Sequence, residues 1–243
     1  MSLRSDLDAA AMLLTRLPVR GTPSARAADA AWAWPVIGLL VGFVAAACGW
    51  LVWGFGATQA VAAAVTVAVS VLLSGALHED GLADTADGLW GGGDRARRLE
   101  IMRDSRIGTY GTIALVLSLM LRWSLVATAL MQGQFFAVVV TAALVSRAPM
   151  AVAMRWLPAA RADGLSRGTG RPPARATYMA AGLAIGALAL HGAHGLLAGA
   201  LVVAALWGLG HLARTRIGGQ TGDVLGAVQQ FSEIAVLVAL TSG

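Results

Sequence analysis

Residues 111–131, GTIALVLSLMLRWSLVATALM, contain a single charged side chain, Arg122. Roughly 17–25 mostly apolar residues suffice for a helix to cross a bilayer. Comparable apolar runs recur along the chain, and hydrophobic residues make up 57% of its 243 positions. The sequence therefore predicts an all-α, polytopic membrane protein. The other runs lie near 36–54, 58–77, 134–156, 177–191, 194–212 and 224–241.

The number of membrane spans depends on two of these runs. Residues 177–191 and 194–212 are shorter or borderline and flank HGAHG, so they form either two spans or one kinked hairpin. We therefore expect about six to seven transmembrane helices. A soluble domain would need more polar surface than a chain with 13% charged residues offers. A membrane β-barrel would show two-residue alternation, which this sequence lacks.

The arginines indicate how the chain is oriented in the membrane. Every basic side chain is an arginine, and arginines precede the first apolar run and follow the second, fourth and sixth. The turns FGATQ, QGQ and HGAHG carry no charged residue. Because cytoplasmic loops are enriched in positive charge, we expect a multi-pass protein of the bacterial inner membrane with a cytoplasmic N-terminus.

The ends and the overall organisation suggest one membrane domain over residues 1–243. Residues 1–33 are amphipathic and charged, without the apolar core and cleavage site of a signal peptide. We expect this segment to lie on the membrane surface against lipid. The lone Cys48 excludes a disulfide framework and a thiolate zinc site. We expect no nucleic-acid partner, and the sequence leaves the oligomeric state open, a homo-oligomer included.

The stretch HEDGLADTADG, residues 78–88, holds four of the 13 acidic residues of the chain. Asp80, Asp84 and Asp87 are spaced four and three apart, which places them on one face of a helix, about 5–6 Å from one another. Three like charges at that distance repel unless a cation lies among them, and Mg²⁺ prefers oxygen ligands. We interpret the three as catalytic metal ligands. An acidic helix start is the alternative.

Two further features of this stretch bear on its chemistry. Gly81 and Gly88 lower helix propensity, so the segment is expected to be irregular or broken and to let its backbone approach a ligand. His78 borders the carboxylates and is a candidate general base, or else a structural histidine. Glu79 points away from the acidic face.

A second polar segment, IMRDSRIGTYG at 101–111, precedes the third apolar run. Its arginines offer forked donors suited to phosphate oxygens, and its carboxylate is a further catalytic and metal-binding candidate. Headgroup anchoring is the alternative role. The candidate residues here and in the preceding helix are Arg98, Arg103, Asp104, Ser105, Arg106 and Thr109.

A third segment, RTRIGGQTGDVLGA at 214–227, supplies Thr221 and Asp223 at the start of the last apolar run, where they could meet a phosphate or a nucleobase. Ionisable residues inside membrane spans usually face a partner or a cavity. We therefore expect Glu233 to neutralise Arg122 or Arg147, and Arg147 is a candidate for an anionic substrate. Together, residues 78–110 and 214–223 predict cytoplasmic active-site loops for metal-dependent phosphoryl transfer.

These motifs resemble the cobalamin synthase family, the adenosylcobinamide-GDP ribazoletransferases. The resemblance lies above all in the two segments at 78–88 and 101–111, and it extends to GGQTGDVLGA, to LTRLPV at 14–19 and to WPVIGLLVG at 34–42. It implies transfer of the adenosylcobinamide phosphate group from adenosylcobinamide-GDP to α-ribazole or its 5′-phosphate, with release of GMP and a requirement for Mg²⁺.

Two other functions were weighed against this one. CDP-alcohol phosphotransferases carry a motif that resembles D-x-x-D-G-x-x-A-R. The aspartates and glycines of this chain instead follow the order D-G-x-x-D-x-x-D-G. A transporter for a cation or corrinoid would place its site near the middle of the membrane, whereas the acidic cluster lies at the end of an apolar run. The sequence leaves open the number of metal ions, the preferred form of α-ribazole and the lower-ligand base.

Overall fold

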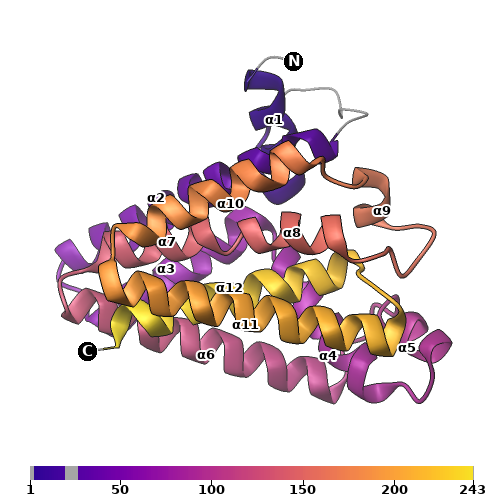
Figure 1. Cartoon of the computed structure of the whole chain (residues 1–243). Coiled ribbons are helices and arrows are strands. Elements are labelled where there is room, and N and C mark those ends of the chain that lie inside the picture. Colours follow the sequence, from indigo (N-terminus) through magenta and orange to yellow (C-terminus); the bar gives the residue numbers. More distant parts are fainter. Residues whose placement is uncertain (1–2, 20–26, 243) are drawn as a thin grey trace.

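The computed structural model describes residues 3–19 and 27–242, and within these ranges the chain is a bundle of helices without a strand (Figure 1). The predicted all-α class is confirmed. The elements are α1 (Leu3–Leu14), the 3₁₀ helix η1 (Ala27–Ala33), α2 (Trp34–Gly54), α3 (Gln59–Ser74), α4 (Leu77–Gly91), α5 (Arg95–Ile101), α6 (Thr109–Met131), α7 (Phe135–Val145), α8 (Ala148–Trp156), α9 (Leu165–Thr169), α10 (Ala174–Ala189), α11 (Gly192–Ile217) and α12 (Gly222–Thr241).

Five stretches of the described chain are long and apolar enough to cross a membrane, and α3 with α4 makes a sixth if that bent pair counts as one span. The five are η1 with α2, α6, α7 with α8, α11, and α12. The count of five lies just below the predicted six to seven, and it reaches six only when the bent pair is counted. α10 has only 16 residues and joins α11 at HGAHG, where the sequence left two readings open.

The helix within the apolar run near 58–77 ends before the run does. Thr58 caps α3 by accepting a hydrogen bond from the Val61 amide, and the helix stops at Ser74. Gly75 and Ala76 take left-handed φ values of 64° and 58°, and α4 leaves at 87° to α3. The sharp turn arises because two consecutive residues leave the helical region.

Residues 78–88 are also more regular than the sequence predicts. They belong to the continuous helix α4, and the expected loop over 78–110 contains all of α5 as well. The loop predicted over 214–223 is short, because α11 continues to Ile217 and α12 begins at Gly222. Tertiary contacts described below explain why the glycines of α4 do not break it.

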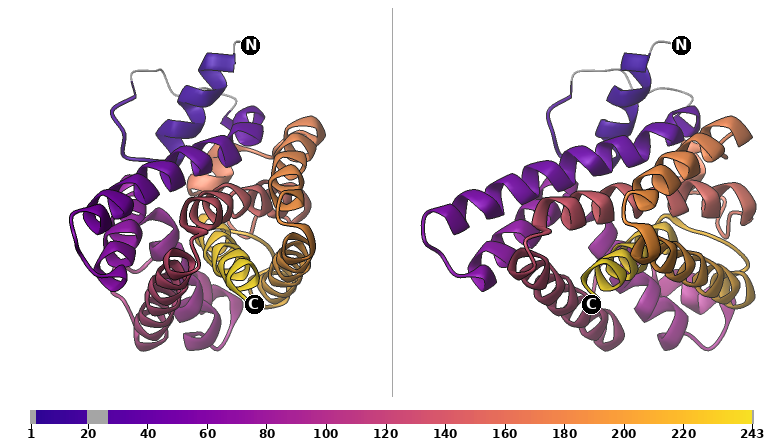
Figure 2. Two further views of the ribbon diagram at one scale, coloured as in Figure 1. Left: turned by 90° about the vertical axis from the view of Figure 1, so that its left-hand side faces the viewer. Right: turned by 60° about the vertical axis from the view of Figure 1, so that its left-hand side comes forward.

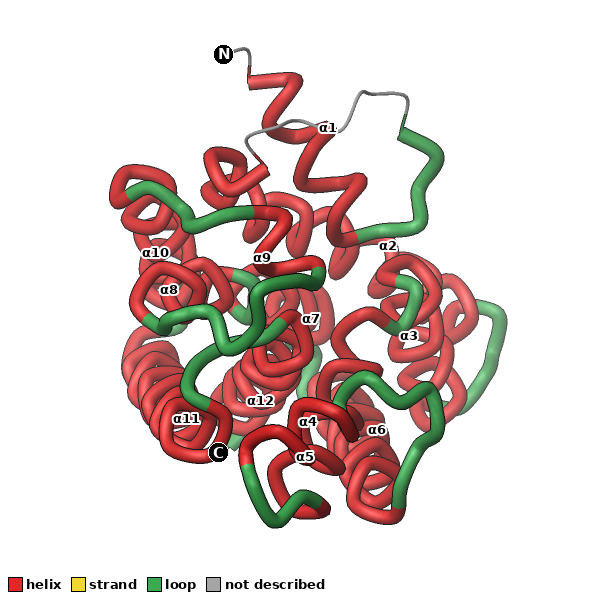
Figure 3. Tube along the Cα trace, turned by 90° about the vertical axis from the view of Figure 1, so that its right-hand side faces the viewer, coloured by secondary structure: helices red, strands yellow, loops and turns green. Residues whose placement is uncertain are grey.

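The last helix, α12, forms the centre of the bundle. In α12, 78% of the apolar stretch is buried inside the bundle, whereas the corresponding share is 28% in α6 and 22% in α11. It lies among α11, α7, α4 and α6 (Figures 2 and 3). Large apolar side chains such as Leu117, Val203 and Trp207 are exposed on the outer helices, as expected for a surface in contact with lipid. α1 runs across the long axis of the bundle (Figure 1).

A balanced set of charges lies inside the bundle. Arg122 of α6 donates to Glu79 of α4 at 2.7 Å and pairs with Glu233 of α12 at 3.0 Å. Arg147, between α7 and α8, pairs with Glu233 at 3.1 Å. The expected neutralisation by Glu233 is confirmed, and it extends to both arginines. Two cations and two anions therefore join four parts of the bundle without a net charge.

Candidate active site

The site begins where α4 crosses α12 at two glycines. A Cβ added to Gly81 would lie 2.8 Å from the Asp223 carbonyl oxygen, and one added to Gly226 would lie 3.1 Å from the His78 carbonyl oxygen. The glycines therefore let helix backbones touch each other, and the predicted approach of a ligand to the Gly81 backbone is not needed to explain this residue. The crossing brings Asp80 and Asp223 to the same cavity.

This first cavity has a volume of about 140 Å³ and opens to solvent. Asp80 and Asp223 are among its lining residues, together with the apolar side chains of Leu13, Met150 and Leu225. Its lining comes from α1, α2, α4, α8, α9 and α12 and from the loops before α9 and α12. The cavity therefore combines an apolar body with a charged mouth, an arrangement typical of small-molecule sites.

The cationic group of this cavity is Arg161, in the loop after α8. Its guanidinium donates to Asp223 Oδ2 at 2.7 Å, and the Thr221 hydroxyl donates to the same oxygen at 3.1 Å. Thr221 also caps α12 through the Val224 amide. Both predicted residues of the third segment, Thr221 and Asp223, thus line the cavity, and Thr221 has the alternative N-capping role as well.

Backbone pairing fixes the loop that carries Arg161. The Ala160 amide donates to the Gln220 carbonyl, and the Gln220 amide donates to the Pro158 carbonyl, each at 2.8 Å. Gly219 makes this possible because its φ of 156° brings it against Pro158, where a side chain would collide. Two loops far apart in the sequence therefore form one edge of the cavity.

Carboxylates gather at the mouth of the cavity. Asp84 is half-buried and lies within electrostatic reach of Asp80, Asp223 and Arg161. Among the described residues, no three histidine, cysteine or acidic side chains form a ready-made metal site. Mg²⁺ is commonly held by only one or two protein carboxylates together with substrate phosphates. The oxygen donors present therefore suit that ion.

Asp87 has a different environment from Asp80. Its two carboxylate oxygens accept hydrogen bonds from the Gly108 amide at 2.7 Å and the Gly111 amide at 2.9 Å, at the start of α6. It is buried, and a side chain at either glycine would occupy the space of the carboxylate. Asp87 therefore anchors the segment 101–111 to α4, which explains why an aspartate and two glycines are needed here.

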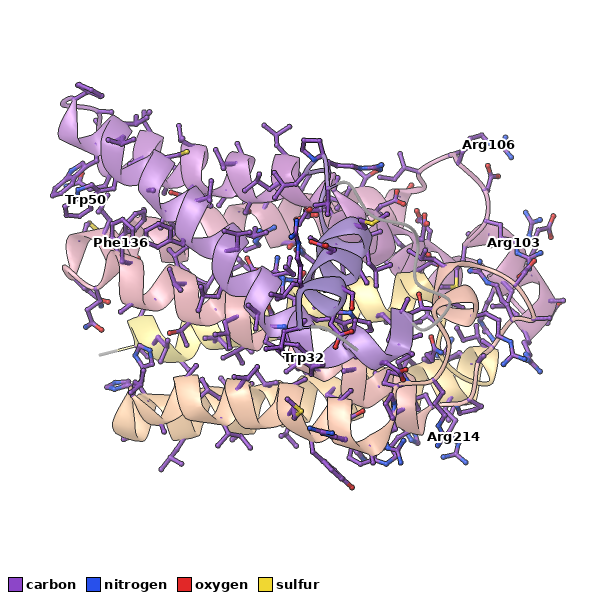
Figure 4. All side chains as sticks on the ribbon, turned by 90° about the horizontal axis from the view of Figure 1, so that it is seen from above. Trp32, Trp50, Arg103, Arg106, Phe136 and Arg214 are labelled. Carbon is purple, nitrogen blue, oxygen red and sulfur yellow. The ribbon has the colours of Figure 1, made fainter. Side chains whose placement is uncertain are left out.

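The arginines of the second segment lie at the exposed edge of the molecule, at the end opposite Trp50 and Phe136 (Figure 4). Arg106 donates to Asp104 at 2.7 Å, and these hydrogen bonds hold the pKa of the Asp104 carboxyl below its usual range. Arg103 donates to Asp163 at 2.6 Å, and Asp163 lines the cavity. Asp104 and Arg106 are thus paired with each other. Arg103 is connected to the cavity by its contact with Asp163.

The remaining predicted residues divide between the cavity and its surroundings. His78 is buried and lines the first cavity. Arg147 lies in the interior charge network and outside this cavity. Ser105 and Thr109 are exposed, and Arg98 donates to the Arg216 carbonyl at 3.4 Å, which ties α5 to α11.

A second cavity of about 460 Å³ adjoins the first and shares Met154, Ser166 and Gln220 with it. Its described lining contains three arginines and no acidic residue: Arg167, Arg171 and Arg214. Such a group of guanidiniums suits phosphate oxygens. We call this the arginine cavity.

Several of these residues escaped prediction from the sequence. In the sequence, Arg161, Arg167 and Arg171 indicate only the orientation of the chain in the membrane, and Gln220 within GGQTGD indicates no role. The signal that could have found them is the composition of RADGLSRGTGR at 161–171, where arginines alternate with glycines and hydroxyls outside any apolar run.

Comparison with known proteins gives consistent matches over almost the whole chain. Residues 6–241 match the family model described as cobalamin-5-phosphate synthase. An adenosylcobinamide-GDP ribazoletransferase of Bradyrhizobium diazoefficiens is 46% identical over 96% of this chain and 92% of the relative. The enzyme of that name from Mesorhizobium japonicum is 44% identical over 100% and 97%, and that from Azorhizobium caulinodans is 44% identical over 97% and 95%. No solved structure matches the chain.

Proposed function

Because this chain belongs to the cobalamin-5-phosphate synthase family, we propose that it transfers the adenosylcobinamide phosphate group from adenosylcobinamide-GDP to α-ribazole or its 5′-phosphate. GMP is released, and adenosylcobalamin or its 5′-phosphate is formed. The observation that supports this reaction in the site itself is the pair of adjoining cavities. One has carboxylates at the mouth of an apolar body, and the other has three arginines.

The reaction has simple demands on the protein. A hydroxyl oxygen of α-ribazole attacks the phosphorus that carries cobinamide, a new O–P bond forms, and the bridging O–P bond to GMP breaks. The hydroxyl releases its proton, and GMP leaves with the bonding electron pair. Negative charge therefore grows on a phosphate oxygen of the leaving group. We assign the stabilisation of that charge to Arg167, Arg171 and Arg214, because all three line the arginine cavity.

We also propose that the enzyme depends on Mg²⁺, held by one or two of the carboxylates of Asp80, Asp84 and Asp223 together with substrate phosphates. Asp80 and Asp223 face the cavity and Asp84 is electrostatically coupled to both. When bound, the ion would neutralise phosphate charge. This set keeps Asp80 and Asp84 of the four predicted ligands, omits Asp87 and Asp104, and adds Asp223, which the sequence predicts only as a substrate-binding residue. Asp87 is already used by two backbone amides and Asp104 by Arg106.

The end of the bundle that carries both cavities is proposed to face the cytoplasm. This proposal rests on the arginines, because Arg103, Arg106 and Arg214 all lie at that end (Figure 4). Cysteine labelling tests it after Cys48 has been changed to Ala. A cysteine at exposed position Ser105 should react only in opened cells, whereas one at Gln134 should react in intact cells. The reverse pattern would refute the orientation.

The purified protein tests the reaction directly. GMP should be released only when adenosylcobinamide-GDP and α-ribazole are both present, and chelation of Mg²⁺ should abolish release. Release without α-ribazole would contradict the transfer reaction, and undiminished release after chelation would contradict only the metal proposal. Substrate uptake into proteoliposomes without GMP release would instead favour the transporter alternative.

A further inference from the structure

Four side chains that line the first cavity have a buried polar atom without a hydrogen-bond partner, and one of these atoms is Nε of the charged Arg161. The other three belong to a tryptophan, a histidine and a glutamine. These atoms are Trp34 Nε1, His78 Nε2 and Gln220 Oε1, and their residues are 2%, 2% and 4% exposed. All three residues line the cavity, although they come from α2, α4 and the loop before α12. Buried polar groups are nearly always hydrogen-bonded in proteins. Three such atoms around one cavity therefore point to a ligand with polar atoms of its own.

The chemistry of these atoms restricts the ligand. The Trp34 indole only donates, Gln220 Oε1 only accepts, and the His78 nitrogen takes either role according to its tautomer. None of them requires a charged partner. The walls between them are apolar, with Leu14, Met150 and Met154 among the lining residues. A suitable ligand is neutral where it contacts these groups, with an apolar body and hydroxyls that donate and accept.

We propose that the first cavity binds the acceptor substrate, a nucleoside whose aromatic base packs on the apolar walls and whose ribose hydroxyls pair with Trp34, His78 and Gln220. The proposal rests on the transfer reaction proposed above. The acceptor hydroxyls then lie on the same side as Asp80 and Asp223.

The charge of the two cavities supports this division between the substrates. The donor carries a diphosphate, which matches the three arginines of the arginine cavity. The first cavity offers Asp80, Asp163 and Asp223 against one guanidinium, that of Arg161, and so disfavours a bare diphosphate. Because the cavities share Met154, Ser166 and Gln220, substrates bound in this way meet at that boundary.

A pair of tryptophans provides a matched experiment. Trp34→Phe keeps an aromatic ring and removes only the unpartnered N–H. Trp32→Phe is the control, because the Trp32 indole already donates to Asp6 at 2.9 Å and does not line the cavity. The measurements are KM for each substrate and the equilibrium binding of α-ribazole alone. Trp34→Phe should raise KM and Kd for α-ribazole about fivefold to tenfold, as expected for one lost hydrogen bond, with donor KM within twofold of the wild type.

Unchanged α-ribazole affinity in Trp34→Phe, or an effect on donor KM alone, would overturn the proposal. Gln220→Met gives a second decision if Trp34→Phe does not fold. It removes the acceptor oxygen but leaves the backbone pairing of Gln220 with Pro158 and Ala160 available, and it should also weaken α-ribazole binding selectively. The two proposals can fail separately. If the wild type releases no GMP in the presence of both substrates, but binds α-ribazole with an affinity that Trp34→Phe lowers, the proposed reaction is contradicted and the binding site remains supported.

Discussion

Gly81 of α4 and Gly226 of α12 touch backbone to backbone. A Cβ added to Gly81 would lie 3.1 Å from the Gly226 Cα, and one added to Gly226 would lie 3.2 Å from the Gly81 Cα. This contact sets the distance between the two helices that carry Asp80 and Asp223. The packing of two glycines therefore determines how closely the carboxylates of the site approach one another.

Gly81→Ala should separate α4 from α12, because the new methyl group would meet the Asp223 backbone oxygen at 2.8 Å. Overpacking of this kind costs about 1–3 kcal/mol, so we expect a lower unfolding temperature and at least a tenfold loss of GMP release. Gly186→Ala on α10 is the control, since nothing lies within 4 Å of its added Cβ. Wild-type activity in Gly81→Ala would show that the spacing of the helices is not critical.

Asp80 and Asp87 should respond differently to the same substitution. Asp80→Asn changes an exposed carboxylate at the cavity, so GMP release should fall about 10²-fold while the unfolding temperature stays close to that of the wild type. Asp87→Asn replaces a buried acceptor of two amides, and we expect it to destabilise the protein by about 1.5–3 kcal/mol. Thermal unfolding and GMP release, measured on both variants, separate the two roles. Equal unfolding temperatures would contradict this division.

The stability of the protein should depend on whether the buried positive and negative charges are balanced, and less on how many of them are present. Glu233→Gln leaves Arg122 and Arg147 opposite Glu79 alone, and an uncompensated buried charge costs roughly 3–5 kcal/mol. The double variant Glu233→Gln with Arg147→Met restores the balance, so it should unfold at a higher temperature than Glu233→Gln. Additive destabilisation in the double variant would be inconsistent with this explanation.

Substitutions in the arginine cavity should raise the KM for the donor, adenosylcobinamide-GDP, more than the KM for the acceptor, α-ribazole. Arg167→Gln, Arg171→Gln and Arg214→Gln each remove a guanidinium from its lining, and we expect donor KM to rise about threefold or more per variant. Arg175→Gln removes the same charge from an exposed position outside the cavity and should have no such effect. The assays belong in detergent and in nanodiscs with and without anionic lipid. Donor KM that responds equally in all four variants would indicate a general charge effect.

The helices of this chain follow from apolar patterning, because residues such as those of α6 and α11 form long apolar runs between polar loops. The bend at Gly75 and Ala76 does not follow from that pattern, since an apolar run continues up to it. The helical state of 78–91 was equally hidden. Glycine propensity argues against a helix there, but Gly81 is needed for contact with α12 and Gly88 for contact with Met102. Tertiary packing outweighs local propensity at both positions.

The sequence predicts only those residues of the site that belong to its motifs. The sequence indicates Asp80, Thr221, Asp223 and His78, and the structure brings all four to one cavity. Periodicity places Asp87 on the same helix face as Asp80, but it cannot reveal that α6 begins beside Asp87. Arg161, Trp34 and Gln220 reach the cavity through the crossing of distant elements, and spacing along the chain carries no record of such contacts.

The bend between α3 and α4 also has a consequence for the surrounding lipid. α3 and α10 have 16 residues each and lie on different sides of the bundle (Figure 3). At about 1.5 Å per residue each is about 24 Å long, roughly 6 Å less than the hydrocarbon core of a typical bilayer. Neither helix alone would cross a typical bilayer without local thinning of the lipid, which costs fractions of a kcal/mol per ångström. We therefore expect the protein to release GMP faster in bilayers with shorter acyl chains.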